Sequence, residues 1–155
     1  MIRTILFSLL LSLLNFTSFA QEDLLQKVAP DHIPGKWKGK LIQGEGGLAR
    51  EYTFELNLEL DTQNKIKGHS YIYVDKSHAK ISLKGELKGN QIHLQEIKIV
   101  DYKITPSYLW CIKKMDLKFL FKRSFFRLEG KWTGSTSQGE CTPGVIQLKK
   151  ATIKA

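Results

Sequence analysis

The fold is decided by residues 51–74, which read EYTFELNLELDTQNKIKGHSYIYV. In the first half, apolar residues alternate with polar ones, which is typical of a strand with one face in a core. The polar turn at 61–65 folds the second half back, so that Leu58 faces Gly68 and Phe54 faces Ile72. A slip of one residue would bring charged side chains to the apolar face, so the alternation specifies the register.

The same pairing rule extends outward through the neighbouring hairpins. Across the tight turns at 74–77, 89–90 and 123–124 the expected partners are Ile72 with Ala79, Leu87 with Ile92, Phe121 with Phe126 and Met115 with Trp132. The chain then holds about eight strands joined mainly by short turns, an arrangement that closes without free edges. The sequence therefore predicts an all-β fold, with a single domain over residues 35–151 that forms an eight-stranded antiparallel up-and-down β-barrel.

One strand changes phase. Ile92 and Leu94 point to one face and Ile97 and Ile99 to the other, so a β-bulge is expected near Glu96. Glu96 is the acid expected to face inward, where it would bond bulge amides. Glycines also fall on the inner face, where missing side chains let a small barrel bend around its tryptophans: Gly39, Gly68, Gly85, Gly130 and Gly134.

Residues 1–20 have the parts of a secretory signal peptide. Arg3 gives a positive start, residues 5–14 are apolar, and small residues stand at 18 and 20 before the cleavage point. The apolar stretch is short for a bilayer span, although a retained membrane anchor is the alternative. We expect an exported protein, periplasmic or extracellular, with no transmembrane span in the mature chain. Residues 21–34 are a lead-in, with a short N-terminal helical segment over 22–28 that Pro30 stops.

Alternation alone does not tell whether the apolar face looks inward or outward. A transmembrane eight-strand barrel would carry the Lys and Glu side chains in its lumen. The short turns at both ends, the inward-fitting glycines and the lysine-rich end at 149–154, which lacks a terminal aromatic residue, favour an apolar interior instead.

Cys111 and Cys141 are the only cysteines in the chain. An oxidising compartment favours their pairing, so we expect a disulfide that closes a loop of about thirty residues. Two buried free thiols are the alternative. A catalytic thiol is not expected, because neither cysteine has a nearby histidine or a C-x-x-C partner in the sequence.

The start of the first strand, Gly35-x-Trp37, carries a resemblance. In an exported chain of this size with a strand meander, this motif resembles the lipocalin and avidin-like barrels of the calycin group. The resemblance implies a lipocalin-like barrel with a ligand site inside it or at its mouth. The chain departs from lipocalins in lacking an evident C-terminal helix and an assigned arginine over the tryptophan, and from avidin in having Gly39 where that pattern has asparagine.

The sequence shows no catalytic or metal-binding constellation. His32, His69, His78 and His93 do not recur at ligand spacing, and the expected registers bring no pair of them together. The acids at 51, 55 and 59 share a strand face, but it is the outer one, whereas general acid–base catalysis needs carboxylates held in a cleft. We therefore expect a non-enzymatic protein with no metal site and no cofactor.

Aromatic residues are the candidates for ligand binding. Those expected on inner faces could fill the barrel or line an apolar cup that holds a small ligand. A second group, Tyr102, Tyr108, Leu109 and Trp110 around Pro106, belongs to a long connection that could form a recognition surface at the mouth or a plug. The predicted ligand-binding residues are Trp37, Tyr52, Phe54, Tyr108, Trp110, Phe119, Phe121 and Trp132.

The positive charge of the outer surface suggests an alternative function. Removing Arg3 from a formal net charge of +9 leaves +8, and the lysines fall mainly on outward positions: Lys36, Lys38, Lys40, Lys67, Lys80, Lys84, Lys114, Lys118, Lys122 and Lys131. Such a surface serves solubility, or binds an anionic envelope polysaccharide, lipid headgroups or a protein partner. Nucleic acid is not an expected partner, because no interleaved aromatic and basic stripe is evident. The sequence leaves the oligomeric state open.

Overall fold

The computed structural model describes residues 21–47, 49–103 and 109–151 of the chain, most of them in strands. The predicted signal peptide lies outside the described residues. The strands are β1 (Gly35–Gln43), β2 (Glu51–Leu60), β3 (Lys65–Val74), β4 (Ser77–Lys88), β5 (Gln91–Lys103), β6 (Ile112–Lys122), β7 (Phe125–Thr136), β8 (Gly139–Glu140) and β9 (Gly144–Lys150).

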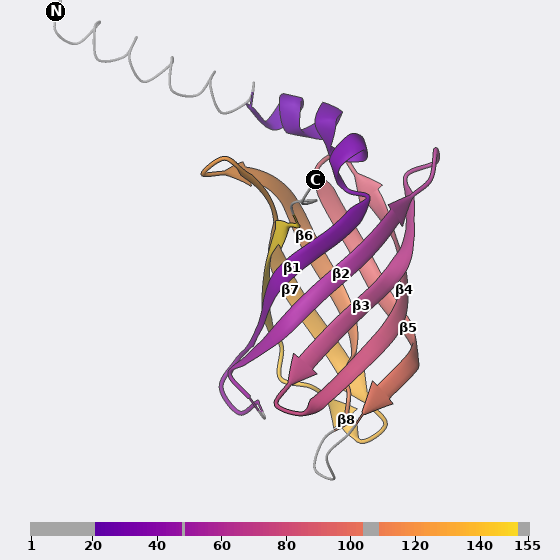
Figure 1. Cartoon of the computed structure of the whole chain (residues 1–155), viewed down its shortest axis with the longest axis vertical. Coiled ribbons are helices and arrows are strands. Elements are labelled where there is room, and N and C mark those ends of the chain that lie inside the picture. The colour runs from indigo at the N-terminus through magenta and orange to yellow at the C-terminus, as the bar shows by residue number, and fades with distance from the viewer. Residues whose placement is uncertain (1–20, 48, 104–108, 152–155) are drawn as a thin grey trace, which may run out of the picture.

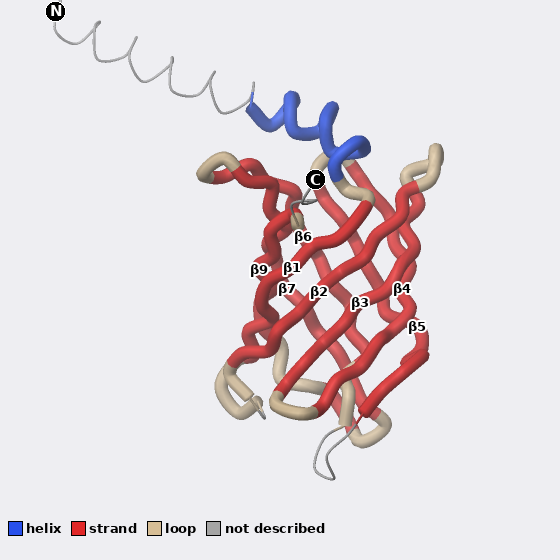
Figure 2. Tube along the Cα trace, in the orientation of Figure 1, coloured by secondary structure: helices blue, strands red, loops and turns tan. Residues whose placement is uncertain are grey.

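The strands close into a barrel (Figures 1 and 2). Each of β1 to β7 pairs antiparallel with the next, and β9 closes the ring by pairing with β7 on one side and β1 on the other. The two-residue β8 turns back on the last two residues of β7 and pairs with no other described strand. The wall therefore has eight strands in up-and-down order, as the sequence predicts.

The predicted registers are confirmed. Leu58 faces Gly68, and the partners across the next hairpins are Ile72 with Ala79, Leu87 with Ile92, Phe121 with Phe126 and Met115 with Trp132. These agreements follow from the two-residue period, because only one register puts every apolar residue of a strand on the same face.

Apolar side chains fill most of the inside of the barrel, and the charged side chains lie outside except for Glu96 and Lys113, which are buried. The fully buried residues include Trp37, Phe54 and Phe119. This arrangement excludes the alternative barrel with Lys and Glu in its lumen. The strands coil so closely that a side chain at an inner glycine would collide with the neighbouring strand: a Cβ atom on Gly130 would lie 1.9 Å from the main-chain oxygen of Asp116.

The phase change in β5 is caused by two irregularities in its pairing with β4. The register shifts between Ser82 and Leu83 and again between Lys80 and Ile81, which leaves Ile97 and Val100 without a partner on β4. The first shift lies next to Glu96, so the predicted bulge is confirmed, and Glu96 is buried as expected.

A helix over residues 21–32 covers one end of the barrel, drawn at the top of Figure 1. Leu25, Ala29 and Ile33 are buried against the barrel, at the four-residue spacing that aligns side chains along a helix. The prediction that Pro30 stops the helix was wrong. The proline removes one amide donor, but packing of Ala29 and Ile33 holds the last turn, in which the Ile33 amide donates to the Ala29 carbonyl at 2.9 Å. Within the described residues, no helix has the length and apolar character needed to cross a membrane.

Lys150 locks this helix to the barrel. Its ammonium lies 4.7 Å from the ring centroid of Trp37 and donates to the main-chain carbonyls of His32, at 2.6 Å, and Pro34. The indole of Trp37 donates to the carbonyl of Ile33 at 2.9 Å. Lys150 thus lies over the first-strand tryptophan, where the calycin resemblance calls for an arginine. We call this end of the barrel the closed end.

The pH dependence of stability should report on Lys150. Burial lowers the pKa of its amine to about 8, whereas a lysine in an unfolded chain titrates near about 10.4. Between these values the unfolded chain binds more protons, so the contribution of Lys150 to the free energy of unfolding rises with pH. We expect the difference in free energy of unfolding between wild type and Lys150→Met to grow from about pH 7.5 to about pH 10 in urea titrations. Lys149→Met is the matched control for the loss of one charge, and a Lys150→Met difference that stays constant with pH would contradict the assignment.

Candidate functional site

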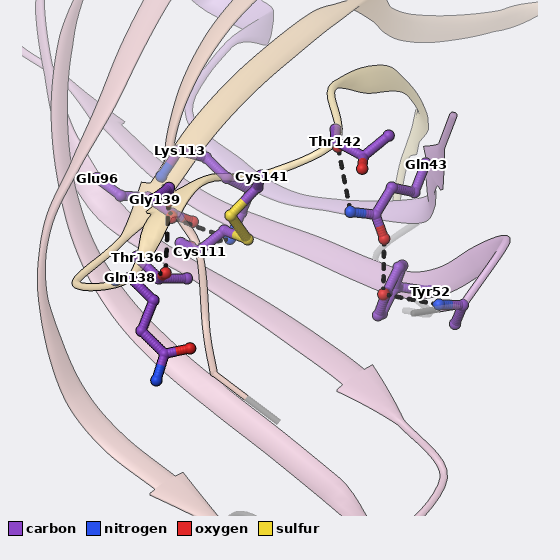
Figure 3. Close-up of a disulfide and its surroundings, with 11 residues drawn as sticks. Gln43, Tyr52, Glu96, Cys111, Lys113, Thr136, Gln138, Gly139, Cys141 and Thr142 are labelled. Atoms are coloured by element: carbon purple, nitrogen blue, oxygen red, sulfur yellow. Dashed lines mark hydrogen bonds and ion pairs between the residues drawn. A yellow bond between two sulfur atoms is a disulfide. The ribbon is translucent and has the colours of Figure 1, made fainter. Parts of the chain in front are cut away.

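The opposite end of the barrel, which we call the open end, carries the longer connections (Figure 1). A hydrogen-bonded chain ties two of them together (Figure 3). The Tyr52 hydroxyl donates to Gln43 Oε1 at 2.8 Å and accepts from the Ala49 amide at 3.1 Å. Gln43 Nε2 donates to the carbonyl of Thr142 at 3.1 Å. The predicted ligand residue Tyr52 therefore orders the rim between β1, β2 and the segment before β9.

The predicted disulfide between Cys111 and Cys141 is confirmed. It joins the segment that enters β6 to the loop between β8 and β9 (Figure 3). Leu109 and Trp110, just before Cys111, are thereby held against the open end of the barrel.

A buried polar cluster lies behind the disulfide. Glu96 and Lys113 form an ion pair with 3.0 Å between Glu96 Oε2 and Lys113 Nζ, and both side chains are at most 1% exposed. The same carboxylate oxygen accepts the main-chain amide of Lys113 at 2.8 Å, and the Ser70 hydroxyl donates to the other oxygen. Lys113 Nζ also donates to the Cys111 carbonyl at 2.9 Å. Every charged atom of the pair thus has a partner.

This cluster exists because β5 and β6 separate. Their ladder joins only Gln91–Gln95 to Lys114–Lys118, and the next residue of β6, Lys113, has no strand partner on β5. The Glu96 side chain takes the place of that strand and accepts the Lys113 amide. Glu96 faces inward as predicted, but its donors are not bulge amides: they include the amide and the ammonium of Lys113 across the gap. Lys113 was not among the predicted site residues, although it shares the inward parity of Met115.

A cleft opens in the wall beyond the ion pair. Tyr102 lies on the inward side of β5, because its partner Ala79 is buried, yet Tyr102 is 59% exposed. The described residues of β5 beyond Gln95 do not pair with β6, and a cleft with a volume of about 460 Å³ lies between the two strands at this level. Its lining is mainly apolar and comes from β5, the segment before β6 and the end of β7: Ile99, Tyr102, Leu109, Trp110, Ile112, Ser135, Thr136 and Ser137. We call it the side cleft.

Trp110 separates the side cleft from a small inner cavity. The cavity has a volume of about 50 Å³ and is lined by Leu41, Gln43, Tyr52, Ile72, Leu109, Trp110, Cys111, Lys113 and Trp132. Trp110 is 8% exposed, and within the described part of the chain its Nε1 donor has no hydrogen-bond partner. Its ring therefore forms a wall that two hollows share, with one unused donor.

The predicted ligand-binding residues fall into three groups. Trp37, Phe54 and Phe119 are fully buried in a packed core, the first alternative of the sequence analysis for the barrel interior. The residues that the fold brings together around the inner cavity are Tyr52, Trp110 and Trp132. Phe121 is expected on the inner face but is 46% exposed at the far end of its strand, where it contacts Phe126. Tyr108 lies outside the described residues.

None of the four histidines, all within the described residues, lines the side cleft or the inner cavity. His32 stacks on Phe126, His78 Nε2 is 3.6 Å from Asp101, and His93 Nδ1 is 2.6 Å from Asp116. In the described ranges of the chain, no three His, Cys, Asp or Glu side chains gather closely enough to hold a metal ion.

The comparisons with known proteins add no family. Neither protein-family models, nor curated proteins, nor solved structures give a match to this chain. The fold and the site therefore rest on the residues themselves.

Removing the disulfide should destabilise the open end. A loop of 30 residues corresponds to about 3 to 4 kcal/mol of closure entropy in the unfolded chain. We expect the Cys111→Ser/Cys141→Ser variant to lose stability by about this amount in urea denaturation. Unreduced protein should show no reactive thiol under denaturing conditions, and two reactive thiols would contradict the pairing.

The ion pair should show strong coupling in a double-mutant cycle. Lys113→Met alone leaves the Glu96 carboxylate buried without its cation, which typically costs about 3 to 5 kcal/mol. Glu96→Gln/Lys113→Met keeps an oxygen acceptor for the Lys113 amide and removes both charges, so we expect it to lose less than either single variant. Urea denaturation measures all four proteins. Additive losses would show that the two side chains do not act as a pair.

Proposed function

We propose that this protein is a non-enzymatic binding module that takes a small apolar ligand in the side cleft at the open end of its barrel. The calycin resemblance supports the proposal. The chain forms a closed antiparallel barrel of eight strands with one end covered and the other carrying long connections. The cation over Trp37 adds to that likeness.

The volumes favour the side cleft over the barrel interior. An inner cavity of about 50 Å³ holds a few water molecules at most, and the side cleft of about 460 Å³ is in the range of small-molecule sites, about 300 to 1,000 Å³. The ligand therefore lies against β5 and Trp110, with the core of the barrel as its floor. Displacement of the Trp110 ring would join the two hollows.

Trp110 is the observation that carries the proposal. A buried indole donor without an acceptor costs free energy, about 1 to 3 kcal/mol for a typical polar group. Nε1 is itself buried, so the Trp110 ring must shift to present it; a ligand with an oxygen acceptor on an apolar body would then satisfy Nε1 while it covers Ile99 and Ile112. This favours compounds such as fatty acids, esters or ketones over pure hydrocarbons.

Binding of dansyl-labelled undecanoic acid in lipid-free solution tests the site. Leu109→Glu places a charge in the cleft at a side chain that is 45% exposed, and Phe121→Glu makes the same change at the closed end, where exposure is 46%. We expect Leu109→Glu to weaken binding at least about tenfold, the effect of 1.4 kcal/mol, and Phe121→Glu to leave it within about twofold. Energy transfer from tryptophan to the dansyl group gives the affinity.

The Trp110→Phe variant tests the contribution of the Nε1 donor separately from that of the aromatic ring. It keeps an aromatic wall and removes Nε1, so we expect about fivefold weaker binding of the acid and an unchanged affinity for an apolar probe without an oxygen acceptor. Binding of the uncharged probe by the cleft should depend little on ionic strength. No binding by the wild type, or equal losses in Leu109→Glu and Phe121→Glu, would contradict the proposal.

A further inference from the structure

Exposed apolar side chains are concentrated on the strands and segments next to the side cleft, and two of them, Tyr102 and Leu109, line it. Of the large apolar residues that are exposed in the described part of the chain, the majority lie at the end of β3, along the second half of β5 and just before β6: Tyr73, Ile97, Val100, Tyr102 and Leu109. The ends of β3 and β5 lie at the same end of the barrel (Figure 1). The gathering is too local to be the scatter of single apolar residues that a protein surface usually shows.

Two of these side chains are exposed because of the irregularities in β5. Ile97 and Val100 are the residues that the register shifts leave without partners on β4, and about half of each is open to solvent. Polar residues at these positions would satisfy the strand equally well, so the fold does not require aliphatic side chains here. A partner that buries Ile97 and Val100 would explain why both positions carry aliphatic side chains.

Lysines without ion pairs surround the same residues. Lys98 and Lys103 flank the exposed part of β5, Lys80 lies beside it on β4, and Lys76 is in the turn before β4. Among the described residues none of these four lies within ion-pair distance of a carboxylate, whereas most lysines of β1 and β6 do, including Lys38, Lys40, Lys113, Lys118 and Lys122. Lys80 lies 5.6 Å from the Tyr71 ring centroid.

Two carboxylates also belong to this region. Asp101 lies 3.6 Å from His78 Nε2, and Asp75 is in the turn before β4. Four lysines against two acids leave the region positively charged. We call the nine residues Tyr73, Lys76, Lys80, Ile97, Lys98, Val100, Tyr102, Lys103 and Leu109 the rim patch.

We propose that the rim patch docks on an anionic lipid surface. Aliphatic and tyrosine side chains enter the headgroup region, and lysines reach the phosphates with their long stems against the apolar boundary. Each lysine near an anionic leaflet adds to the attraction, which salt screens. Tyr102 and Leu109 belong both to the rim patch and to the side cleft, so docking places the mouth of the cleft on the bilayer. Transfer of a ligand between the bilayer and the cleft rests on the proposed function; the docking itself does not.

Sedimentation with vesicles tests the docking. We use the mature chain with vesicles of phosphatidylglycerol and phosphatidylcholine, and with pure phosphatidylcholine. The wild type should bind the anionic vesicles at about 0.15 M salt and leave the neutral ones unbound. Lys98→Gln/Lys103→Gln should weaken binding at least about tenfold, and the equal charge loss Lys36→Gln/Lys131→Gln, on β1 and β7, should change it less than about threefold.

Variants of the exposed apolar residues distinguish docking on the bilayer from charge attraction alone. Ile97→Ser/Val100→Ser should weaken vesicle binding at least about fivefold with no change in net charge, and Leu24→Ser/Val145→Ser, which are exposed elsewhere, should leave it unchanged. Equal losses in the two lysine pairs, an unchanged Ile97→Ser/Val100→Ser variant, or no binding of the wild type would overturn the docking. Failure of the proposed function appears separately, as loss of fatty-acid binding in lipid-free solution, and leaves vesicle binding intact.

Discussion

Where β5 and β6 separate, the barrel wall is completed by one side chain, that of Glu96. Glu96 accepts the amide of Lys113 across the gap between β5 and β6 and neutralises the ammonium of the same residue. Burying two charges is costly, and apolar residues of similar volume often stabilise a protein more. A plain ladder would, however, close the wall at this level. The ion pair satisfies the freed amide while β5 turns away, and the cleft follows from that departure.

The two ends of the barrel differ in packing: the closed end is sealed, and the open end holds the cleft and the inner cavity. At the closed end, the helix, Trp37 and Lys150 form a packed seal in which Trp37 Nε1 and Lys150 Nζ donate to main-chain carbonyls. At the open end, a disulfide and the hydrogen bonds of Gln43 hold connections that pack less densely. A binding site needs such a frame, because flexible rims lose affinity to the entropy of ordering them. The cavity beside Trp110 lies where these restraints meet.

Much of the fold could be predicted from the sequence, because each strand has a period of two and each tight turn fixes the next register. The hairpins, the bulge near Glu96 and the disulfide followed from local pattern. Lys113 did not, since a lysine among alternating apolar residues is usually solvated, and its burial depends on a carboxylate from another strand. Phe121 has the inward parity but lies beyond the end of the packed core. The cleft depends on where strands separate, which no single strand's pattern encodes.

The pairing of β1 with β9 has a consequence for how the chain reaches this structure. The hairpins can form as soon as each turn is made, but the ring closes only when Leu41 meets Ile146 and Gly39 meets Leu148. Contacts between such distant residues must overcome loop-closure entropy, and proteins rich in them fold slowly. Until the last strand arrives, β1 and β7 each keep an unpaired edge, and the lysines along them oppose pairing with other chains. Closure of the barrel therefore waits for the last strand of the chain.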